Sequence, residues 1–324
     1  MSNYSVLLFH SIDDRELLSL KDLGNIRPAL FEKLIVKLKK EFDVVSLKEA
    51  VRYISGETKP KERLIAFTFD DGPKSYAAHA VPIMEAYGLP STSFLITDCI
   101  DDTSIYWRYL YNYCIHKGLA RKLAGFIHDE YKADIREDEI ISFSRNHYDR
   151  TKNRRIVERL LEGVVPEEEY RSSEQGLFLS LEDIRRLKEN PLVSFGIHTR
   201  SHPVLKCLSD EEIRDEIAGS LDFYRSRIGD DAPMLSIPFG RLFMDYDERA
   251  IATAKTLSID VVLSAYGGGN AEGQPLYNIR RISVHEGKLE DGIDTFIKTL
   301  HGPAIPVEYR ENEKRLAELL SGRK

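Results

Sequence analysis

The sequence has few of the residues that stabilise secreted or membrane-embedded folds. Its 324 residues include only three cysteines, Cys99, Cys114 and Cys207, and their odd number and wide spacing argue against a disulfide framework or a zinc knuckle. No apolar run approaches the length of a membrane span, and the first residues lead into a strand pattern without a basic, apolar leader. We therefore expect a cytoplasmic protein with reduced thiols and no integral membrane segment.

An excess of positive charge is also lacking. The chain carries 46 Lys and Arg against 53 Asp and Glu, a formal net charge of -7. This balance argues against a nucleic-acid partner or an anionic membrane surface. Hydrophobic residues make up 42% of the chain, which is enough to bury a sizeable core.

Strand and helix patterns alternate along most of the chain. Ser46 with Glu49, Ser180 with Asp183, and Ser209 with Glu212 each have the spacing of a capped helix start. Apolar runs predict seven strands, near residues 4–9, 64–69, 92–97, 192–197, 234–238, 260–264 and 281–284. Such alternation favours an α/β fold with a parallel barrel.

Two adjacent carboxylates follow one of these apolar runs. Asp70 and Asp71 come directly after the strand pattern and before Gly72 and Pro73, which permit a turn. Neighbouring side chains of a strand point in opposite directions, so both acids can reach one cleft only if the chain turns there. The alternative is an ordinary surface turn, since Asp-Asp-Gly is common in turns.

Two histidines follow a second apolar run. If the chain becomes helical after Ile197, His198 and His202 lie one turn apart and can chelate one cation. A solvent-exposed helix face is the alternative. Combined with one acid of the pair, the histidines form a set of two imidazoles and one carboxylate, which leaves coordination positions open for water and substrate.

These two motifs resemble those of the polysaccharide deacetylase family, the NodB-like carbohydrate esterases of family 4. The first reads Thr68-Phe69-Asp70-Asp71-Gly72 and the second reads His198-Thr199-Arg200-Ser201-His202. The resemblance covers roughly residues 4 to 100 and 176 to 300. It implies a distorted (β/α) barrel of about seven parallel strands, with its chemistry at the carboxyl ends of the strands. It also implies hydrolysis of an N-acetyl group on an amino sugar.

The resemblance assigns roles to the residues of both motifs. Asp71, His198 and His202 are similar to the family's metal ligands, and Asp70 is similar to the general base that deprotonates the metal-bound water. We expect one divalent ion, with zinc as the first choice, although cobalt, nickel, manganese or iron would suit the same ligands.

A third motif departs from the family pattern. Leu235 to Arg241 matches best, and Phe239 is expected to donate its backbone N–H to the oxyanion, since Pro238 has none. The family commonly has an arginine where this chain has Ser236, and that arginine pairs with the base. The missing charge could come from Arg241, Arg280 or Arg281.

Two further histidines are candidates for the site. His285 follows the last strand pattern, where the family's leaving-group histidine would protonate the departing amine; a solvent-facing histidine is the alternative. His10 follows the first strand pattern and should lie at the rim of the barrel mouth, where a structural hydrogen bond is its expected use.

Residues 101–175 interrupt the alternation, and we expect a helical insertion there within a barrel of residues 1–302. The insertion should emerge at the catalytic face as a lid or recognition subdomain. The Tyr106, Tyr109 and Tyr113 stripe suits sugar rings but is more typical of packing, and the basic Arg145–Arg155 stretch could bind phosphate or form a solvated face. Residues 303–324 are expected to form a polar tail.

The sequence thus predicts a metal-dependent hydrolase that removes an N-acetyl or similar N-acyl group from an amino sugar. The expected substrate is an N-acylated sugar, nucleotide-linked or lipid-linked, and no oligomeric state is predicted. A deformylase or other small-amide hydrolase on the same fold is one alternative. A glycan-binding protein without activity is the other.

Overall fold

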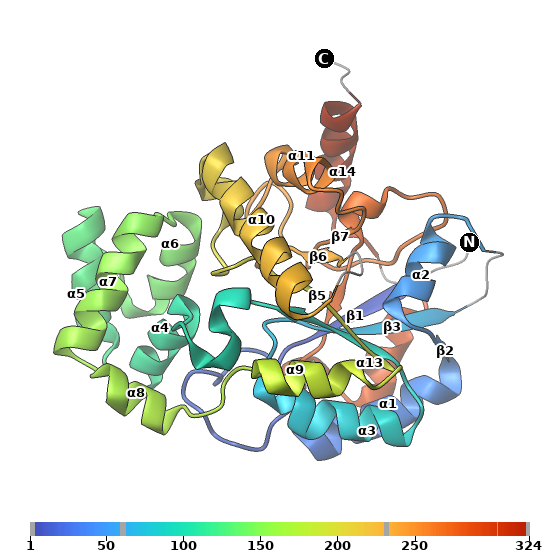
Figure 1. Cartoon of the computed structure of the whole chain (residues 1–324), viewed down its shortest axis with the longest axis horizontal. Helices are drawn as coiled ribbons and strands as arrows, with labels where there is room; N and C mark the ends of the chain where they lie inside the picture. The colour runs from blue at the N-terminus through green and yellow to red at the C-terminus, as the bar shows by residue number, and fades with distance from the viewer. Residues whose placement is uncertain (1–3, 59–62, 230–232, 303, 322–324) are drawn as a thin grey trace.

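A curled parallel sheet forms the centre of the fold (Figure 1). The computed structural model describes residues 4–58, 63–229, 233–302 and 304–321. Seven strands follow the order β7-β6-β5-β4-β3-β1-β8, and β2, outside this order, pairs with β3. The strands are β1 (Ser5–Phe9), β2 (Asp43–Val44), β3 (Leu64–Phe69), β4 (Ser91–Leu95), β5 (Val193–Ile197), β6 (Leu235–Ser236), β7 (Val262–Leu263) and β8 (Ile282–Ser283).

One short segment brings the two edges of the sheet together. Ile279 forms a parallel bridge with Leu263 of β7, through hydrogen bonds of 2.9 Å to Val262 O and from Ser264 N. Three residues later the same segment enters β8, which pairs with β1. The result is a distorted (β/α) barrel, as the sequence predicts, and all seven predicted strands form. The sequence patterns did not predict β2.

Alternate side chains of the strands enter two different apolar clusters, because neighbouring residues of a strand face opposite ways. Leu7 and Phe67 belong to the larger cluster, which lies beneath the surrounding helices. Val6 and Ala66 belong to a smaller cluster that α2 (Leu47–Ile54) covers. The barrel is therefore packed on both faces of its sheet, which fixes the positions of the strand ends.

Helices connect the strands and surround the sheet. The predicted caps form: Ser46 accepts a hydrogen bond from Glu49 N, and Ser180 and Ser209 begin helices with reciprocal capping boxes. Besides α2, these helices are α1 (Pro28–Glu41), α3 (Val81–Ala86), α9 (Leu181–Lys188), α10 (Asp210–Arg227), α11 (Glu248–Thr256), α12 (Glu286–Leu289), α13 (Ile293–Leu300) and α14 (Val307–Leu320).

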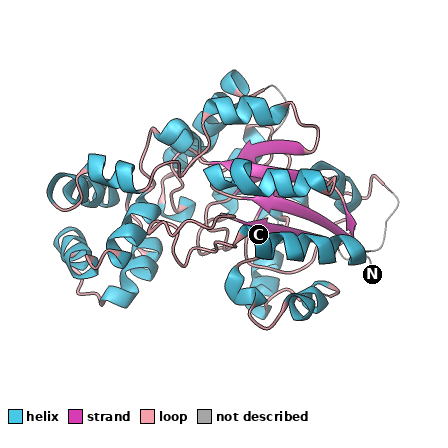
Figure 2. Ribbon diagram, turned by 90° about the horizontal axis from the view of Figure 1, so that it is seen from below, coloured by secondary structure: helices cyan, strands magenta, loops and turns pink. Residues whose placement is uncertain are grey.

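Residues 101–175 fold into a helical lobe beside the sheet (Figures 1 and 2). Its inner helix, α4, turns Tyr109, Leu110 and Tyr113 into the core. The α-helices of the lobe are α4 (Trp107–His116), α5 (Ala120–Tyr131), α6 (Ile140–Asn146), α7 (Arg150–Gly163) and α8 (Glu167–Ser173). Across the described ranges of the chain, no helix is both long enough and apolar enough to cross a membrane.

The C-terminal helix α14 packs on the barrel. Tyr309 and Leu316 are buried, and the Tyr309 ring stacks on Tyr266 with centroids 4.1 Å apart. Glu313 accepts hydrogen bonds from Arg280 Nε at 2.6 Å and Nη2 at 3.0 Å. The predicted polar tail therefore has one face that contributes to the fold; residues 303 and 322–324 of that tail lie outside the described ranges.

Candidate active site

The carboxyl ends of the parallel strands surround a cavity of about 250 Å³. Leu8 and Ser283 line it from β1 and β8, and Phe239 and Ala265 line it from the segments after β6 and β7. The same cavity contains Asp70, Asp71, His198 and His202, so the structure brings together both acids and both histidines of the first two motifs.

A left-handed turn directs both acids of the first motif to this cavity. Asp71 has φ of 71° and Gly72 has φ of 68°, so the chain leaves the strand direction directly after Asp70. A Cβ atom on Gly72 would lie 2.8 Å from the side chain of Leu95, which a residue larger than glycine could not accommodate without a shift. In a continuing strand the two carboxylates would point in opposite directions, and this turn brings both to the same cavity.

The histidine motif folds differently from our expectation. Residues 198–202 form a loop rather than a helical turn, because Thr199 and His202 have φ of 63° and 56°. Two left-handed residues nevertheless bring the imidazoles together, with ring centroids 4.6 Å apart. The four-residue spacing correctly predicted a pair of neighbouring histidines but not the conformation that produces it.

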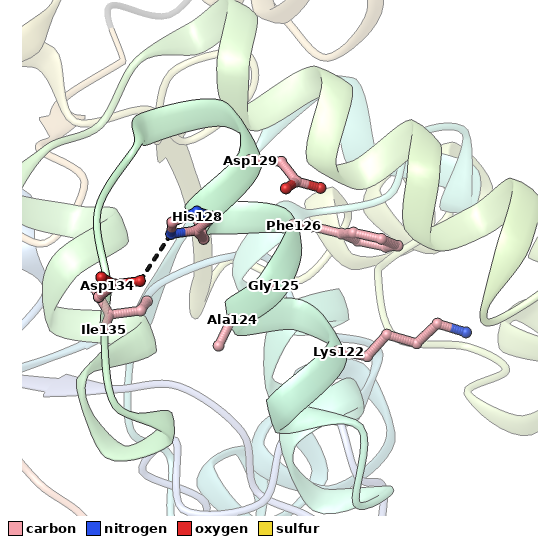
Figure 3. Close-up of a pocket in the computed structure, with 8 residues that line it drawn as sticks. All are labelled: Lys122, Ala124, Gly125, Phe126, His128, Asp129, Asp134 and Ile135. Carbon is pink, nitrogen blue, oxygen red and sulfur yellow. Dashed lines mark ion pairs between the residues drawn. The ribbon is translucent and has the colours of Figure 1, made fainter.

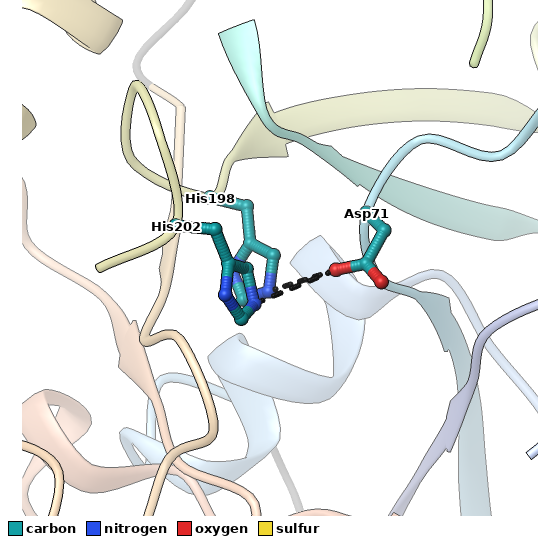
Figure 4. A group of neighbouring side chains, drawn as sticks. All are labelled: Asp71, His198 and His202. Atoms are coloured by element: carbon teal, nitrogen blue, oxygen red, sulfur yellow. Dashed lines mark ion pairs between the residues drawn. The ribbon is translucent and has the colours of Figure 1, made fainter. Parts of the chain in front are cut away.

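Asp71, His198 and His202 converge with one potential ligand atom each (Figure 4). These atoms lie within 4.8 Å of one another, and all three residues are buried. Asp71 Oδ1 is 3.5 Å from His198 Nε2 and 3.6 Å from His202 Nε2. This oxygen is buried and has no hydrogen-bond partner in the described parts of the chain. A cation between the three groups would supply the missing partner.

The outer atoms of these three side chains are held in place. His198 Nδ1 donates to Ser236 O at 2.8 Å, and His202 Nδ1 lies 2.7 Å from the Tyr106 hydroxyl. Tyr109 donates its hydroxyl to Asp71 Oδ2 at 2.9 Å. Such outer contacts orient metal-binding imidazoles and carboxylates and leave their inner atoms free to bind.

Charge and burial set the protonation of the two rings in opposite directions. Burial lowers the pKa of His202 to about 3, and the neighbouring His198 acts in the same direction. Burial would also lower the pKa of His198, but the charges of Asp70 and Asp71 outweigh it and raise that pKa. His202 is therefore neutral at physiological pH, the form that binds a metal ion.

Arg281 supplies the charge that Ser236 lacks. Its Nη1 and Nη2 donate to Asp70 Oδ1 and Oδ2, both at 2.7 Å, in a bidentate pair. The Ser236 hydroxyl donates to Asp70 Oδ2 at 3.0 Å and accepts from Arg281 Nη2 at 2.7 Å. Burial raises the pKa of Asp70, but the Arg281 charge and hydrogen bonds outweigh it, so the pKa is lowered overall.

The other two candidate arginines are bound elsewhere. Arg241 donates from Nε to Asp245 at 2.9 Å, and Arg280 pairs with Glu313. Arg281 side-chain atoms are fully buried, and its Nε donates to Ser264 O at 2.9 Å. Of the three, only Arg281 contacts the predicted base.

Phe239, the predicted oxyanion donor, lines the cavity. It has φ of 59° and follows Pro238 in a tight turn, where Gly240 N donates to Pro238 O at 2.6 Å. Within the described chain, the Phe239 N–H has no hydrogen-bond acceptor.

His10 and His285 both lie close to Gly24. A Cβ atom on Gly24 would be 3.6 Å from His10 Nδ1 and 3.7 Å from His285 Cβ. His10 lines the cavity of the acids, whereas His285 lines a neighbouring cavity with Arg27 and Glu286. Only His10 therefore shares the cavity of Asp70. The reason is that β8 ends at Ser283, and His285 lies beyond it as the N-cap residue of α12.

A separate hollow on the surface of α5 contains none of the predicted residues (Figure 3). It lies among exposed and half-buried side chains and holds one ion pair, His128 Nδ1 to Asp134 Oδ1 at 2.9 Å. Both side chains are at least half exposed, so this is a surface ion pair of the kind that contributes little to stability. We assign this hollow no function.

Sequence patterns alone missed the roles of Tyr106 and Tyr109. Both belong to the aromatic stripe of α4 and its N-cap, and both are buried, as packing residues would be. Their hydroxyls nevertheless contact His202 and Asp71. A tyrosine where leucine or phenylalanine would pack equally well is the only sequence signal for these contacts.

A parallel barrel with buried acids and imidazoles at the carboxyl ends of its strands is an architecture typical of enzymes. A family model described as "Polysaccharide deacetylase" matches residues 57–262. The chain therefore belongs to the polysaccharide deacetylase family. A search of curated proteins found no match.

Solved structures share the fold at low sequence identity. The deacetylase PplD of Streptococcus pyogenes, in complex with acetate, is 17% identical, with a TM-score of 0.61 over 92% of this chain and 98% of PplD. IcaB from Ammonifex degensii is 15% identical, with a TM-score of 0.60 over 89% and 94%. A de-N-acetylase from Aggregatibacter actinomycetemcomitans is 14% identical, with a TM-score of 0.60 over 91% and 100%.

Proposed function

We propose that this protein is a metal-dependent hydrolase that removes an acetyl group from the nitrogen of an amino sugar. One observation carries the proposal: Asp71, His198 and His202 converge in the cavity that also holds Asp70. Membership of the polysaccharide deacetylase family and the likeness to deacetylase folds support it.

The residues fit one divalent ion. Asp71 Oδ1, which has no hydrogen-bond partner in the described ranges, and the two Nε2 atoms face one another, and the remaining polar atoms of these side chains are already engaged. Zinc is our first choice, and cobalt, nickel, manganese and iron suit the same donors. When bound, such an ion supplies a water of lowered pKa and polarises the amide carbonyl.

Asp70 accepts the proton of the attacking water in this proposal. Its low pKa keeps it ionised at neutral pH, and Arg281 with Ser236 fixes the orientation of its carboxylate. Asp70 Oδ2 is 3.6 Å from His198 Nε2, next to the candidate ligands. A positioned carboxylate of this kind contributes general base catalysis.

Two further groups complete the reaction. The Phe239 N–H has no acceptor among the residues that the structure describes, so it can donate to the oxygen that gains negative charge. Protonation of the departing amine falls to His10 in our proposal, in place of the predicted His285, because His10 lines the cavity. A positive charge on His10 would lower the pKa of both Asp70 and Asp71, so its ring lies within electrostatic reach of the acids.

Metal content tests the site directly. We expect close to one equivalent of metal in the purified protein and none in the His198→Ala, His202→Ala double variant, as measured by mass spectrometry. The control is the His128→Ala, His147→Ala double variant, which removes two exposed histidines and should keep the metal. Equally low metal in all three proteins after incubation with zinc or cobalt would reject the proposed site.

Product analysis of the same preparations tests the reaction. Acetate release from an N-acetylated sugar supports the proposal, and formate release from an N-formyl sugar would instead make the protein a deformylase. A metal-loaded protein that binds sugar but releases neither product would be a glycan-binding protein without activity.

Tyr106→Phe should weaken metal binding about 10- to 100-fold, the usual effect of losing an outer partner of a ligating histidine. The substitution keeps the ring and removes only the hydroxyl beside His202 Nδ1. Competition with a chelator measures the metal affinity. Tyr113→Phe is the matched control on α4, because its hydroxyl contacts Lys117 and Ser173 instead. Equal affinities of the two variants would contradict the orienting role of Tyr106.

A further inference from the structure

Two arginines of the helical lobe line the candidate active site. Arg108 lies in the first turn of α4 and Arg145 lies near the end of α6, and both border the cavity of Asp70 and Asp71. The charges of both guanidinium groups act on the Tyr106 hydroxyl, which contacts His202. The two cations are therefore close to the side of the cavity that the candidate metal ligands occupy.

Arg145 is only partly neutralised. Its Nε and Nη2 donate to Asp245 at 2.9 and 2.5 Å, but Arg241 donates to the same buried carboxylate at 2.9 Å. One carboxylate thus serves two guanidinium groups. The Arg145 guanidinium also lies 4.5 Å from the centre of the Phe239 ring, on the wall of the cavity.

Arg108 has no carboxylate partner among the described residues. The one hydrogen bond that its side chain makes there is long, 3.4 Å from Nη1 to Asn112 Oδ1. Burial lowers the pKa of Arg108, and the nearby positive charge of Arg145 acts in the same direction. A cation in the first turn of a helix is also opposed by the helix dipole. The position of Arg108 is therefore costly for the fold alone.

The carboxylates of the cavity are committed to other partners. Among the described residues, Asp70 and Asp71 are the only acids that line it; Arg281 neutralises Asp70, and Asp71 is the proposed ligand of a divalent ion. The wall formed by Arg108 and Arg145 consequently keeps an excess of positive charge. A guanidinium fork with free N–H donors is suited to bidentate binding of a phosphoryl or carboxyl group.

We propose that Arg108, assisted by Arg145, binds a phosphoryl or carboxyl group that the substrate carries on its N-acylated sugar. The substrate is then an anionic sugar derivative, with a phosphoryl or carboxyl group beside the acylated unit. This inference rests on the proposed function, because it takes the N-acylated sugar to be the substrate. The anion site itself does not depend on catalysis.

Binding of sugars without an amide tests the anion site separately from the reaction. The probes are glucose, glucose 1-phosphate and glucuronate, titrated by calorimetry into the metal-loaded protein. We expect one of the two anions to bind at least about 10-fold more tightly than glucose. Arg108→Gln should remove most of that preference, about 10- to 100-fold, and Arg108→Lys should retain part of it. The better anion identifies the group as phosphoryl or carboxyl.

Arg121→Gln is the matched control, because Arg121 is exposed on α5, outside the cavity, and its loss changes the net charge equally. It should bind both anions as the parent does. Anion binding that is no tighter than glucose binding, or that is equal in Arg108→Gln and Arg121→Gln, overturns the proposal. Anion binding through the metal alone would give this second result.

The test is completed by measuring acetyl release from three sugars. These are neutral N-acetylglucosamine and the anionic N-acetylglucosamine 1-phosphate and N-acetylmuramic acid. Arg108→Gln should lower the ratio of kcat/KM for the preferred anionic sugar to kcat/KM for the neutral sugar about 10- to 100-fold. An unchanged ratio with a lower rate on every sugar would mean that Arg108 acts on the reaction itself, which overturns the anion site. No release from any sugar, with anion binding intact, would reject the proposed function and keep the anion site.

Discussion

Asp70→Asn is expected to lower kcat about 100- to 10 000-fold, because an amide cannot accept the proton of the attacking water. The metal content should not change, since Asp71, His198 and His202 remain in place. Acetate release under saturating substrate measures the first quantity, and mass spectrometry of the same sample measures the second. Reduced metal together with reduced activity would indicate that Asp70 is a ligand rather than the base.

The control for this variant is Asp247→Asn. Asp247 is also largely buried, pairs with Arg249 at 3.0 Å and caps α11, but it lies outside the cavity. Its substitution should reduce stability through the lost cap and leave kcat of the folded protein unchanged. Turnover of Asp70→Asn at the level of Asp247→Asn would exclude Asp70 as the general base.

The seven strands from β7 to β8 in the sheet order could be predicted from the sequence because each one lies in a short apolar run, whereas β2, with only the two residues Asp43–Val44, could not. The turn after Asp70 was also predictable, since Gly72 and Pro73 signal it. The loop of His198 and His202 was not, because the four-residue spacing fits both a helical turn and a loop with two left-handed residues. Spacing therefore identified the pair, and only the backbone angles revealed how it forms.

The partner of Asp70 could not be chosen from the sequence. The sequence permits any of three arginines, Arg241, Arg280 and Arg281, as this partner. The choice among them depends on long-range topology. The segment after Ile279 inserts between β7 and β1, so Arg281 reaches inward to Asp70 while Arg280 reaches Glu313 of α14. The same limit applies to His10 and His285, because the end of β8 at Ser283 leaves His285 outside the cavity that His10 lines.

Arg281→Met should lower the free energy of unfolding by about 3–5 kcal/mol, the usual cost of leaving one charge of a buried ion pair without its partner. The side chains of Arg281 and its partner Asp70 are 0% and 4% exposed, so water cannot replace the lost contacts. Urea denaturation of the metal-free proteins measures this cost. Arg136→Met is the control, because its pair with Asp138 is exposed and its loss should have little effect.

Combining Arg281→Met with Asp70→Asn separates the contribution of charge to stability from that of packing. The double variant removes both charges, so we expect it to be more stable than Arg281→Met alone. The pH dependence provides a second check. Arg281 lowers the folded-state pKa of Asp70 below its ordinary value of 3.8, so the pair stabilises the protein above that value and loses its effect as the pH falls through the folded-state pKa.

Without Arg281, burial acts on Asp70 with less opposition and its folded-state pKa rises. The stability difference between the parent and Arg281→Met should therefore narrow as the pH falls from neutral through both folded-state pKa values. A difference that stays constant with pH would show that Arg281 contributes packing rather than charge. The base at this site would then depend on Ser236 and His198 for its ionisation.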